Sequence, residues 1–332
     1  MKPVAVDAMG GDRGPAEIVA GARRAVDELG VPVLLVGPPE RVGDTQGLEL
    51  LACTEVIEMH DDPGGSVRRK KDSSLVRAAE AVRDGAASAM VSAGNTGATM
   101  ASALLRMGRI RGVARPAIAI AIPVPGTTPT VLLDAGANAE VTAPWLVQFA
   151  QMGQAFFSVR YGRVVEGDRK GALPRVGLLS IGEEQTKGTP LVKEAHELLR
   201  STGGIDFIGN VEGRDLMTDQ VDVVVTDGFT GNVVLKTLEG GMRFVQGAIL
   251  ERLTATPELR SAFEVVWPAL APLAEELDPE TYGGAMLLGV DGVCIISHGS
   301  SSARAILNAL GVAREMVEAD LVGHLRDAVR VD

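Results

Sequence analysis

The sequence predicts a single α/β domain over residues 1–332, built on a doubly wound, mostly parallel sheet with a projecting helical hairpin. Short apolar runs alternate with helical patterns along the chain, which is the rhythm of successive β–α–β units. Of the 332 residues, 46% are hydrophobic but only 3% are aromatic, so Val, Leu, Ile and Ala must form most of the core. Such a core is typical of a parallel sheet that is covered on both faces.

Ten segments are predicted as strands, because they are short, apolar and bounded by turn residues. They are residues 3–8, 33–36, 55–58, 89–92, 117–122, 130–133, 176–180, 207–208, 221–226 and 293–297. Helical patterns between them include residues 16–29, 74–84, 96–107, 190–199 and 304–310. No sequence repeat and no low-complexity linker divides the chain, which favours one domain.

Residues 232–277 depart from this alternation, because they carry two helical patterns on either side of residues 254–257 and no strand signal. We expect a helical hairpin that projects from the α/β body. The second arm has an apolar stripe at helical spacing, formed by Leu259, Ala262, Phe263, Val266 and Leu270. Packing in the core or in a dimer explains this stripe, and so does contact with a membrane surface.

In the membrane interpretation, Phe263, Val266, Trp267 and Leu270 lie near the hairpin tip and touch lipid. Trp267 suits a membrane interface, because an indole combines an apolar body with a polar N–H. The scarcity of Lys and Arg on this arm counts against the interpretation. No apolar run approaches the ~20 residues that a membrane-spanning helix needs.

Charge and cysteine content limit the remaining classes of protein. The net charge of −11 argues against nucleic acid as a general partner, because phosphate backbones require a basic face. Cys53 and Cys294 are far apart in sequence, which fits a reduced compartment. Residues 3–8 already resemble a strand rather than a leader peptide. We therefore expect a cytoplasmic protein that at most lies on a membrane surface.

Five junctions share one pattern, in which an apolar strand is followed by glycine with small polar residues and then by a helix. They span residues 92–97, 133–138, 181–188, 227–232 and 297–302. Strand C-termini of a parallel sheet share one edge, where helix N-termini and close backbone approach favour anions. One such junction is usually an ordinary turn with a helix cap, but five together predict a site for phosphorylated or carbonyl ligands.

Other catalytic arrangements find little support. There is no G-x-G-x-x-G after a strand and no phosphate-binding loop of the G-x-x-x-x-G-K-[ST] type. The four histidines are scattered and the two cysteines form no ligand pair, so we expect no metal and no cofactor. Cys294 lies in an apolar run, Cys53 has no evident base, and no serine lies in a G-x-S-x-G turn. Direct transfer between bound substrates remains, helped by positioning and fixed dipoles.

Lys187 and Asn232 are the residues best suited to such a transfer. Lys187 lies in a glycine-flanked loop after a buried strand, where a cation can meet a phosphate, although a solvated surface lysine fits the same position. Asn232 follows Gly231 at a helix start, where its amide either caps the helix or donates to a developing oxyanion. The basic run Arg68, Arg69, Lys70 and Lys71 is either a solvated face or a docking surface for an acidic partner.

The chain resembles the bacterial phosphate acyltransferase family of phospholipid synthesis. The motifs Asp-Ala-Met-Gly-Gly-Asp at residues 7–12, Ser-Ala-Gly-Asn-Thr-Gly at 92–97 and Thr-Asp-Gly-Phe-Thr-Gly-Asn at 226–232 carry the resemblance, and further matches extend over nearly the whole chain. Two departures are Arg13-Gly14-Pro15, where the family often has His-Ala-Pro, and Ala135, where it often has valine. The first puts in doubt a catalytic histidine at that position, but not the reaction.

The resemblance implies transfer of a fatty acyl group from acyl carrier protein to inorganic phosphate, giving acyl phosphate for glycerophospholipid synthesis. It also implies a fold similar to phosphotransacetylases and isopropylmalate dehydrogenases, a homodimer, peripheral membrane association, and Lys187 and Asn232 as the catalytic pair. Acyl carrier protein is acidic, so the basic run becomes its candidate docking surface. Together with the junctions, the resemblance marks as substrate- or phosphate-binding Asp7, Gly10, Gly11, Ser92, Gly94, Asn95, Thr96, Gly97, Asn138, Asp227, Gly228, Thr230, Gly231 and His298.

Two other functions stay open at the level of sequence. A nicotinamide-dependent hydroxyacid dehydrogenase of the related fold would show a change of nicotinamide absorbance with a hydroxyacid, although the chain lacks the nucleotide fingerprint. A membrane-surface scaffold for lipid-synthesis proteins would rest on the apolar stripe, and it would bind membranes without turnover.

Overall fold

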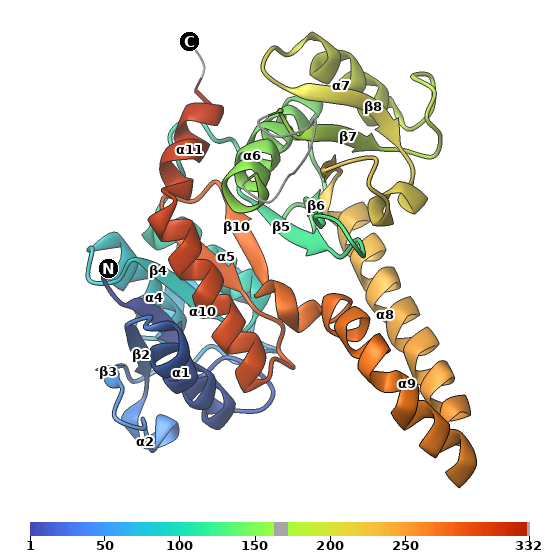
Figure 1. The fold of residues 1–332 in the computed structure, drawn as a ribbon. Helices are drawn as coiled ribbons and strands as arrows, with labels where there is room; N and C mark the ends of the chain where they lie inside the picture. Colours follow the sequence, from blue (N-terminus) through green and yellow to red (C-terminus); the bar gives the residue numbers. More distant parts are fainter. Residues whose placement is uncertain (163–171, 331–332) are drawn as a thin grey trace.

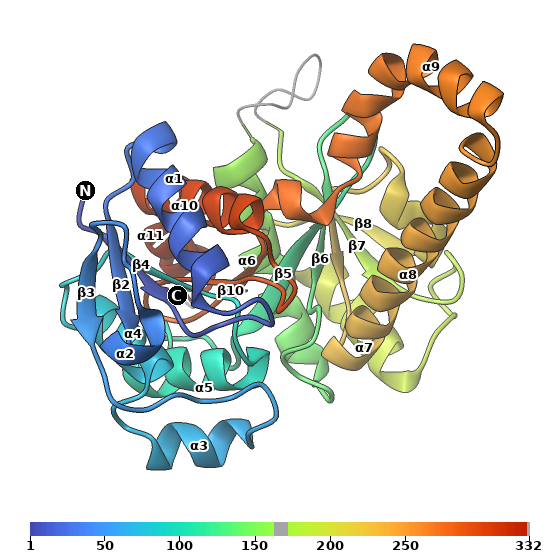
Figure 2. The same ribbon diagram turned by 90° about the horizontal axis from the view of Figure 1, so that it is seen from below.

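The computed structural model describes residues 1–162 and 172–330, which form an eleven-stranded sheet with helices on both faces (Figures 1 and 2). The strands are β1 (Val4–Asp7), β2 (Val33–Gly37), β3 (Glu49–Ala52), β4 (Ala89–Ser92), β5 (Ala117–Ile122), β6 (Thr130–Leu133), β7 (Arg175–Leu179), β8 (Asp206–Val211), β9 (Val223–Val225), β10 (Ala285–Leu288) and β11 (Val293–Ile296). The α-helices are α1 (Pro15–Leu29), α2 (Pro39–Val42), α3 (Pro63–Arg69), α4 (Ser74–Arg83), α5 (Thr96–Arg106), α6 (Ala143–Tyr161), α7 (Pro190–Ser201), α8 (Gly228–Leu253), α9 (Pro257–Glu276), α10 (Ala303–Glu318) and α11 (Leu321–Ala328). Two short 3₁₀ helices are η2 (Gly213–Met217) and η3 (Pro279–Tyr282). The predicted α/β class is confirmed.

The strand order is β3-β2-β1-β4-β11-β10-β5-β6-β9-β7-β8. The strands from β3 to β11 pair in parallel, as do those from β6 to β8. Between these two halves, the pairs β11–β10, β10–β5 and β5–β6 are antiparallel. The sheet is mostly parallel as predicted, but three successive reversals make its two halves run in opposite directions.

The two faces of the sheet are buried under separate helices. Val4 and Val6 of β1 belong to the apolar core beneath α1 and α10, whereas Ala5 between them belongs to the core beneath α4 and α5. Side chains of a strand alternate between faces, so β1 contributes to both cores and is apolar throughout. In α6, Phe149 and Phe157 fill the core over the other half of the sheet.

Helices α8 and α9 form the predicted hairpin, which projects from the sheet (Figures 1 and 2). The chain turns at residues 254–256, where the Thr256 side chain accepts a hydrogen bond from the Leu259 amide and Pro257 opens α9. A hydroxyl cap followed by proline is a favoured helix start, because proline lacks the N–H that the first turn leaves unpaired. The first helix begins at Gly228, four residues before the predicted start of the hairpin.

One predicted strand is absent, and two observed strands, β3 and β10, have no counterpart in the prediction. Residues 55–58 form no strand, since Glu55 makes only an isolated bridge with Ser73, and the edge strand β3 lies earlier in the chain. Strand β10 has no counterpart in the prediction, because its four apolar residues behind Gly283 and Gly284 carry no strand signal of their own. Its position is fixed by antiparallel pairing with two strands. One is β5, which is distant in sequence, and the other is β11, which follows it in the chain.

Candidate active site

A cleft of about 1020 Å³ lies between the hairpin and the sheet. Its apolar lining includes Ile118 and Ile120 of β5 and Ile296 of β11. Residues from both halves of the sheet meet there, notably Thr96, Ala135, Asn232, Ser297 and His298. The five glycine-rich junctions do not share one edge as predicted, because the halves run in opposite directions. Three of them nevertheless supply predicted residues to this cleft, namely Thr96, Asn232 and His298.

At the edge where β1 and β4 end, Asp7 connects the loop after β1 with the loop after β4. Its buried carboxylate accepts hydrogen bonds from the Ser92 hydroxyl at 2.7 Å and from the Met9 amide at 3.1 Å, and the Gly94 amide donates to Ser92 Oγ at 3.0 Å. Burial raises the pKa of Asp7 above its ordinary value, against the lowering effect of these hydrogen bonds. A side chain at Gly10 would lie 2.6 Å from the Gly94 amide nitrogen, so only glycine allows the loops to approach.

Asn95 and Gly97 make contacts that hold the junction after β4 together. The Asn95 Oδ1 atom caps α5 by accepting from the Ala98 amide at 3.0 Å, while its Nδ2 donates to the carbonyls of Met59 and Asp61. Gly97 packs on Pro63 of α3, where an added Cβ would lie only 2.8 Å from the proline ring. This junction therefore contains a helix cap joined to α3, and its role in binding stays a prediction.

At the opposite edge, Asp134 organises the loop after β6. Its fully buried carboxylate accepts five hydrogen bonds, from the amides of Ile118, Gly136, Ala137 and Asn138 and from Asn138 Nδ2, at 2.7–3.1 Å. These contacts are those of a residue that caps the loop. Sequence reasoning did not mark it as a site residue, although an aspartate directly after a buried strand was the available signal.

The start of α8 packs against this loop and carries Asn232. Asp227 caps the helix by accepting from the Thr230 amide at 2.7 Å and from the Thr230 hydroxyl at 2.8 Å. The Gly228 amide donates to the Asn138 carbonyl at 2.7 Å. A Cβ built at Gly231 would lie 1.9 Å from the Asp134 carbonyl oxygen. Five predicted binding residues, Asn138, Asp227, Gly228, Thr230 and Gly231, thus form the frame that holds Asn232.

Asn232 itself is exposed toward the cleft. A methyl group added at Gly136 would lie 3.6–3.8 Å from the Asn232 side chain, so the amide lies directly beside the loop after β6. It is also near the N-terminus of α8, where the helix dipole favours negative charge. This arrangement allows the amide to donate to a carbonyl oxygen that gains negative charge.

Lys187 lies on the same edge as Asn232, because β7 and β9 are parallel neighbours. The loop at residues 181–188 is exposed apart from Gly182 and Gly188, and the Lys187 amide donates to the Glu184 carbonyl at 2.9 Å. The Lys187 side chain is exposed and is not among the described residues that line the cleft. The two predicted catalytic residues therefore share an edge without touching.

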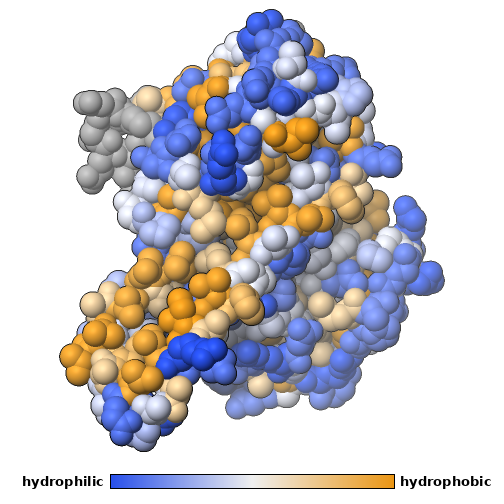
Figure 3. Space-filling model, turned by 90° about the vertical axis from the view of Figure 1, so that its right-hand side faces the viewer, coloured by the Kyte–Doolittle hydropathy of each residue, from blue (hydrophilic) through white to orange (hydrophobic). Residues whose placement is uncertain are grey.

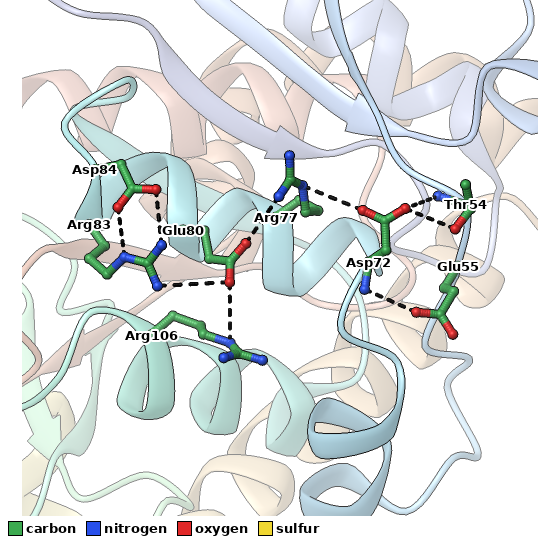
Figure 4. A network of polar contacts seen from close by, with 8 residues as sticks. All are labelled: Thr54, Glu55, Asp72, Arg77, Glu80, Arg83, Asp84 and Arg106. Carbon is green, nitrogen blue, oxygen red and sulfur yellow. Dashed lines mark hydrogen bonds and ion pairs between the residues drawn. The ribbon is translucent and has the colours of Figure 1, made fainter.

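The basic run at the end of α3 is only partly free. Lys70 Nζ forms an ion pair with Asp61 at 2.6 Å and also donates to the Val56 carbonyl, whereas Arg68, Arg69 and Lys71 are exposed. The chain then enters a network that links α4 and α5 (Figure 4), in which Glu80 lies within 3.3–3.8 Å of three arginines. The four carboxylates of this network outnumber its three arginines, so the surplus positive charge of this region stays on the other three side chains of the run.

The four residues predicted for membrane contact lie along α9 and not at the turn. By a rise of 1.5 Å per residue, Phe263 is about 9 Å and Leu270 about 20 Å from Pro257. Phe263, Trp267 and Leu270 line the cleft, whereas Val266 does not and is 48% exposed. The two arms form a largely apolar surface (Figure 3), on which Phe244 and Val265 are 76% and 80% exposed.

Solved structures of known proteins define the class of the fold. A phosphotransacetylase from Streptococcus pyogenes matches with a TM-score of 0.61 at 16% identity, over 97% of this chain and 94% of that chain. A 4-hydroxythreonine-4-phosphate dehydrogenase from Klebsiella pneumoniae matches with a TM-score of 0.55 at 13% identity, over 96% of this chain and 100% of that chain. Such low identities show the fold alone, and one fold hosts both transferases and dehydrogenases.

Sequence similarity identifies the family. The family model described as fatty acid synthesis protein matches residues 2–323. A protein from Desulfitobacterium hafniense (strain Y51) named phosphate acyltransferase is 46% identical over 335 residues, which cover 98% of this chain and 97% of that protein. This chain therefore belongs to the fatty acid synthesis protein family, together with proteins named phosphate acyltransferase.

Proposed function

We infer that this chain is an acyltransferase that moves a fatty acyl group from acyl carrier protein to inorganic phosphate, giving acyl phosphate for glycerophospholipid synthesis. Family membership over nearly the whole chain supports the reaction class. The observation that supports the substrate is the apolar cleft whose lining includes Asn232, since a fatty acyl chain needs an apolar wall and its thioester needs a polar group.

In this reaction a phosphate oxygen attacks the thioester carbonyl carbon. The carbon–sulfur bond breaks as the carbon–oxygen bond forms, and the proton of hydrogen phosphate passes to the departing thiolate. Asn232 donates to the carbonyl oxygen as it gains negative charge, while Lys187 holds the phosphate by charge at the same edge of the sheet. Catalysis then depends on positioning, and no acyl-enzyme intermediate forms.

Incubation of the purified protein with palmitoyl acyl carrier protein and phosphate tests the function directly. Acyl phosphate should accumulate, be trapped by hydroxylamine as the hydroxamate, and depend on added phosphate. Release of free fatty acid without a phosphate requirement would identify a thioesterase instead. Membrane binding with no turnover would favour the scaffold, and a change of nicotinamide absorbance with a hydroxyacid would favour the dehydrogenase.

Arg68, Arg69 and Lys71 are proposed to steer the acidic acyl carrier protein, since they are exposed and lie at the end of α3, which packs against α5 beside the cleft residue Thr96. Arg68→Ala with Arg69→Ala should raise the Michaelis constant for the acyl donor and flatten its salt dependence. Arg23→Ala with Arg24→Ala is the matched control, because it removes the same charge from α1, where both arginines are paired with carboxylates. Equal effects of the two double variants would contradict this docking surface.

The hairpin is proposed to serve both a homodimer and reversible contact with a membrane surface. No helix in residues 1–162 and 172–330 is long and apolar enough to cross a membrane. Val265→Glu with Val266→Glu alters exposed positions and should weaken liposome sedimentation, whereas Phe263→Glu with Leu270→Glu alters the cleft and should impair acyl transfer as well. A monomeric Val265/Val266 variant, read by sedimentation velocity, would assign that surface to the dimer instead.

A further inference from the structure

His196 and Asn210 form a buried polar pair beneath the loop that carries Lys187. His196 of α7 is 7% exposed and Asn210 of β8 is 5% exposed. The Asn210 Oδ1 atom lies 3.0 Å from His196 Nδ1, and Asn210 Nδ2 donates to the Glu184 carbonyl at 3.0 Å. The same carbonyl accepts from the Lys187 amide at 2.9 Å. The Glu184 carbonyl oxygen therefore accepts one hydrogen bond from the buried Asn210 and one from the backbone of Lys187.

The chemistry of the pair fixes its orientation. A carbonyl oxygen accepts only, so the nitrogen of Asn210 must face Glu184 and its oxygen must face the ring. His196 must then carry a proton on Nδ1, because the amide oxygen of Asn210 cannot donate. The ring is held in place by edge-on packing against Phe207, with the ring centroids 5.1 Å apart. A buried amide with both ends satisfied has little freedom to turn.

Other tethers of this loop are weaker. Glu183 pairs with Arg214 at 3.4 Å, but both side chains are 69% exposed, and such pairs contribute little. The hydrogen bond between Gln185 and Glu197 also lies at the surface. Gly188 closes the loop with φ of 95°, a conformation that other residues rarely adopt. The bond from Asn210 differs from these tethers because its donor side chain is buried, so solvent competes with it less.

We propose that Asn210, oriented by His196, is a positioning residue that sets where Lys187 meets the phosphate. The proposal rests on the function proposed above. Asn210 touches neither substrate in this scheme and acts only through the Glu184 carbonyl. Its loss should therefore affect phosphate more than the acyl donor, whereas loss of a residue that merely stabilises the fold would affect both alike.

The test compares Asn210→Ala with Thr130→Val. Thr130 is a matched control, because its buried hydroxyl also donates to a backbone carbonyl, that of Val221 at 3.2 Å. Thr130 lies in β6, which is not a neighbour of β7 in the sheet. Asn210→Ala should raise the Michaelis constant for phosphate about tenfold and change that for the acyl donor less than about twofold. Hydrogen exchange of the backbone amides at residues 181–188 should accelerate in Asn210→Ala and stay unchanged in Thr130→Val.

A second pair of variants decides the matter if Asn210→Ala does not fold. His196→Asn keeps an N–H facing Asn210 and should retain the phosphate constant, whereas His196→Leu should raise it. Unchanged exchange at residues 181–188 in the folded Asn210 or His196→Leu variant, or equal changes in the two Michaelis constants, would overturn the inference. Absence of acyl phosphate formation by the unaltered protein would refute the proposed function alone, since hydrogen exchange still reports on the loop.

Discussion

Two glycines of α8 allow the framing of Asn232 to be tested by the same substitution in one helix. Gly231 lies against the Asp134 carbonyl, and a Cβ there would be 1.9 Å from the oxygen. Gly240, further along α8, is exposed, and a Cβ added to it would meet nothing within 4 Å. Gly231→Ala and Gly240→Ala therefore add the same methyl group and differ only in what it meets.

The two substitutions should change the free energy of unfolding in opposite directions. Alanine is favoured over glycine in a helix interior by about 1 kcal/mol, so Gly240→Ala should stabilise the protein by roughly that amount. At Gly231 an ordinary contact begins near 3.4 Å, so the helix start or the loop after β6 must move by about 1.5 Å. Overpacking of this kind typically costs about 1–3 kcal/mol, which outweighs the helix gain. Asn232 moves with the helix start, and a misplacement of about 1 Å can cost about a hundredfold in rate.

Urea denaturation and acyl phosphate formation read the two effects separately. Gly231→Ala should lower the denaturation midpoint and the turnover rate, whereas Gly240→Ala should raise the midpoint and leave turnover within about twofold. If Gly231→Ala were as stable and as active as Gly240→Ala, the close approach of α8 to the Asp134 loop would not hold Asn232.

Three further predictions concern single groups. Lys187→Ala should lower turnover at least tenfold, which corresponds to ~1.4 kcal/mol, with a native circular dichroism spectrum; activity within twofold would exclude its role. Replacing Cys53 and Cys294 by Ala should leave most activity, because burial raises the pKa of both thiols to about 12, and isolation of an acyl-enzyme on the reaction path would contradict this. Protonated Asp7 contributes stability that is fully present below its unfolded pKa of 3.8 and is lost as pH rises through the higher folded pKa. Asp7→Asn should therefore flatten the fall of the free energy of unfolding above pH 4, and an unchanged slope would contradict it.

The sequence predicts the fold class because the alternation of strands and helices is a local signal. Strand direction is not local. The two antiparallel pairings of β10 leave β11 and β5 running the same way, so the halves of the sheet become opposed at the antiparallel pair β5–β6. A sheet taken as parallel throughout places the junctions after β4 and after β6 on one edge, whereas they lie on two.

The sequence pattern does not distinguish a residue that binds a ligand from one that holds two loops together. Glycine and small polar residues after a strand indicate that backbone segments approach closely, but not whether a ligand or another loop fills the space. The side-chain oxygens of Asn95 and Asp227 accept hydrogen bonds from amides at the starts of α5 and α8, and so cap these helices. Asn210 and His196 escape notice because an amide in a strand and a histidine in a helix become informative only once β8 and α7 are placed together.

The opposed directions of the two half-sheets have a consequence for where the chemistry can occur. In an all-parallel sheet the helix N-termini of both halves would crowd one edge, and the substrate would lie along it. Here the face of β5 and β10 separates the two edges, and the hairpin covers that face. In the proposed reaction an apolar chain would lie between hairpin and sheet with its carbonyl near Asn232, and the loop after β7 would hold the phosphate. In this proposal the phosphate approaches the carbonyl of the acyl donor from a surface other than the one that holds the acyl chain, as a direct transfer between them requires.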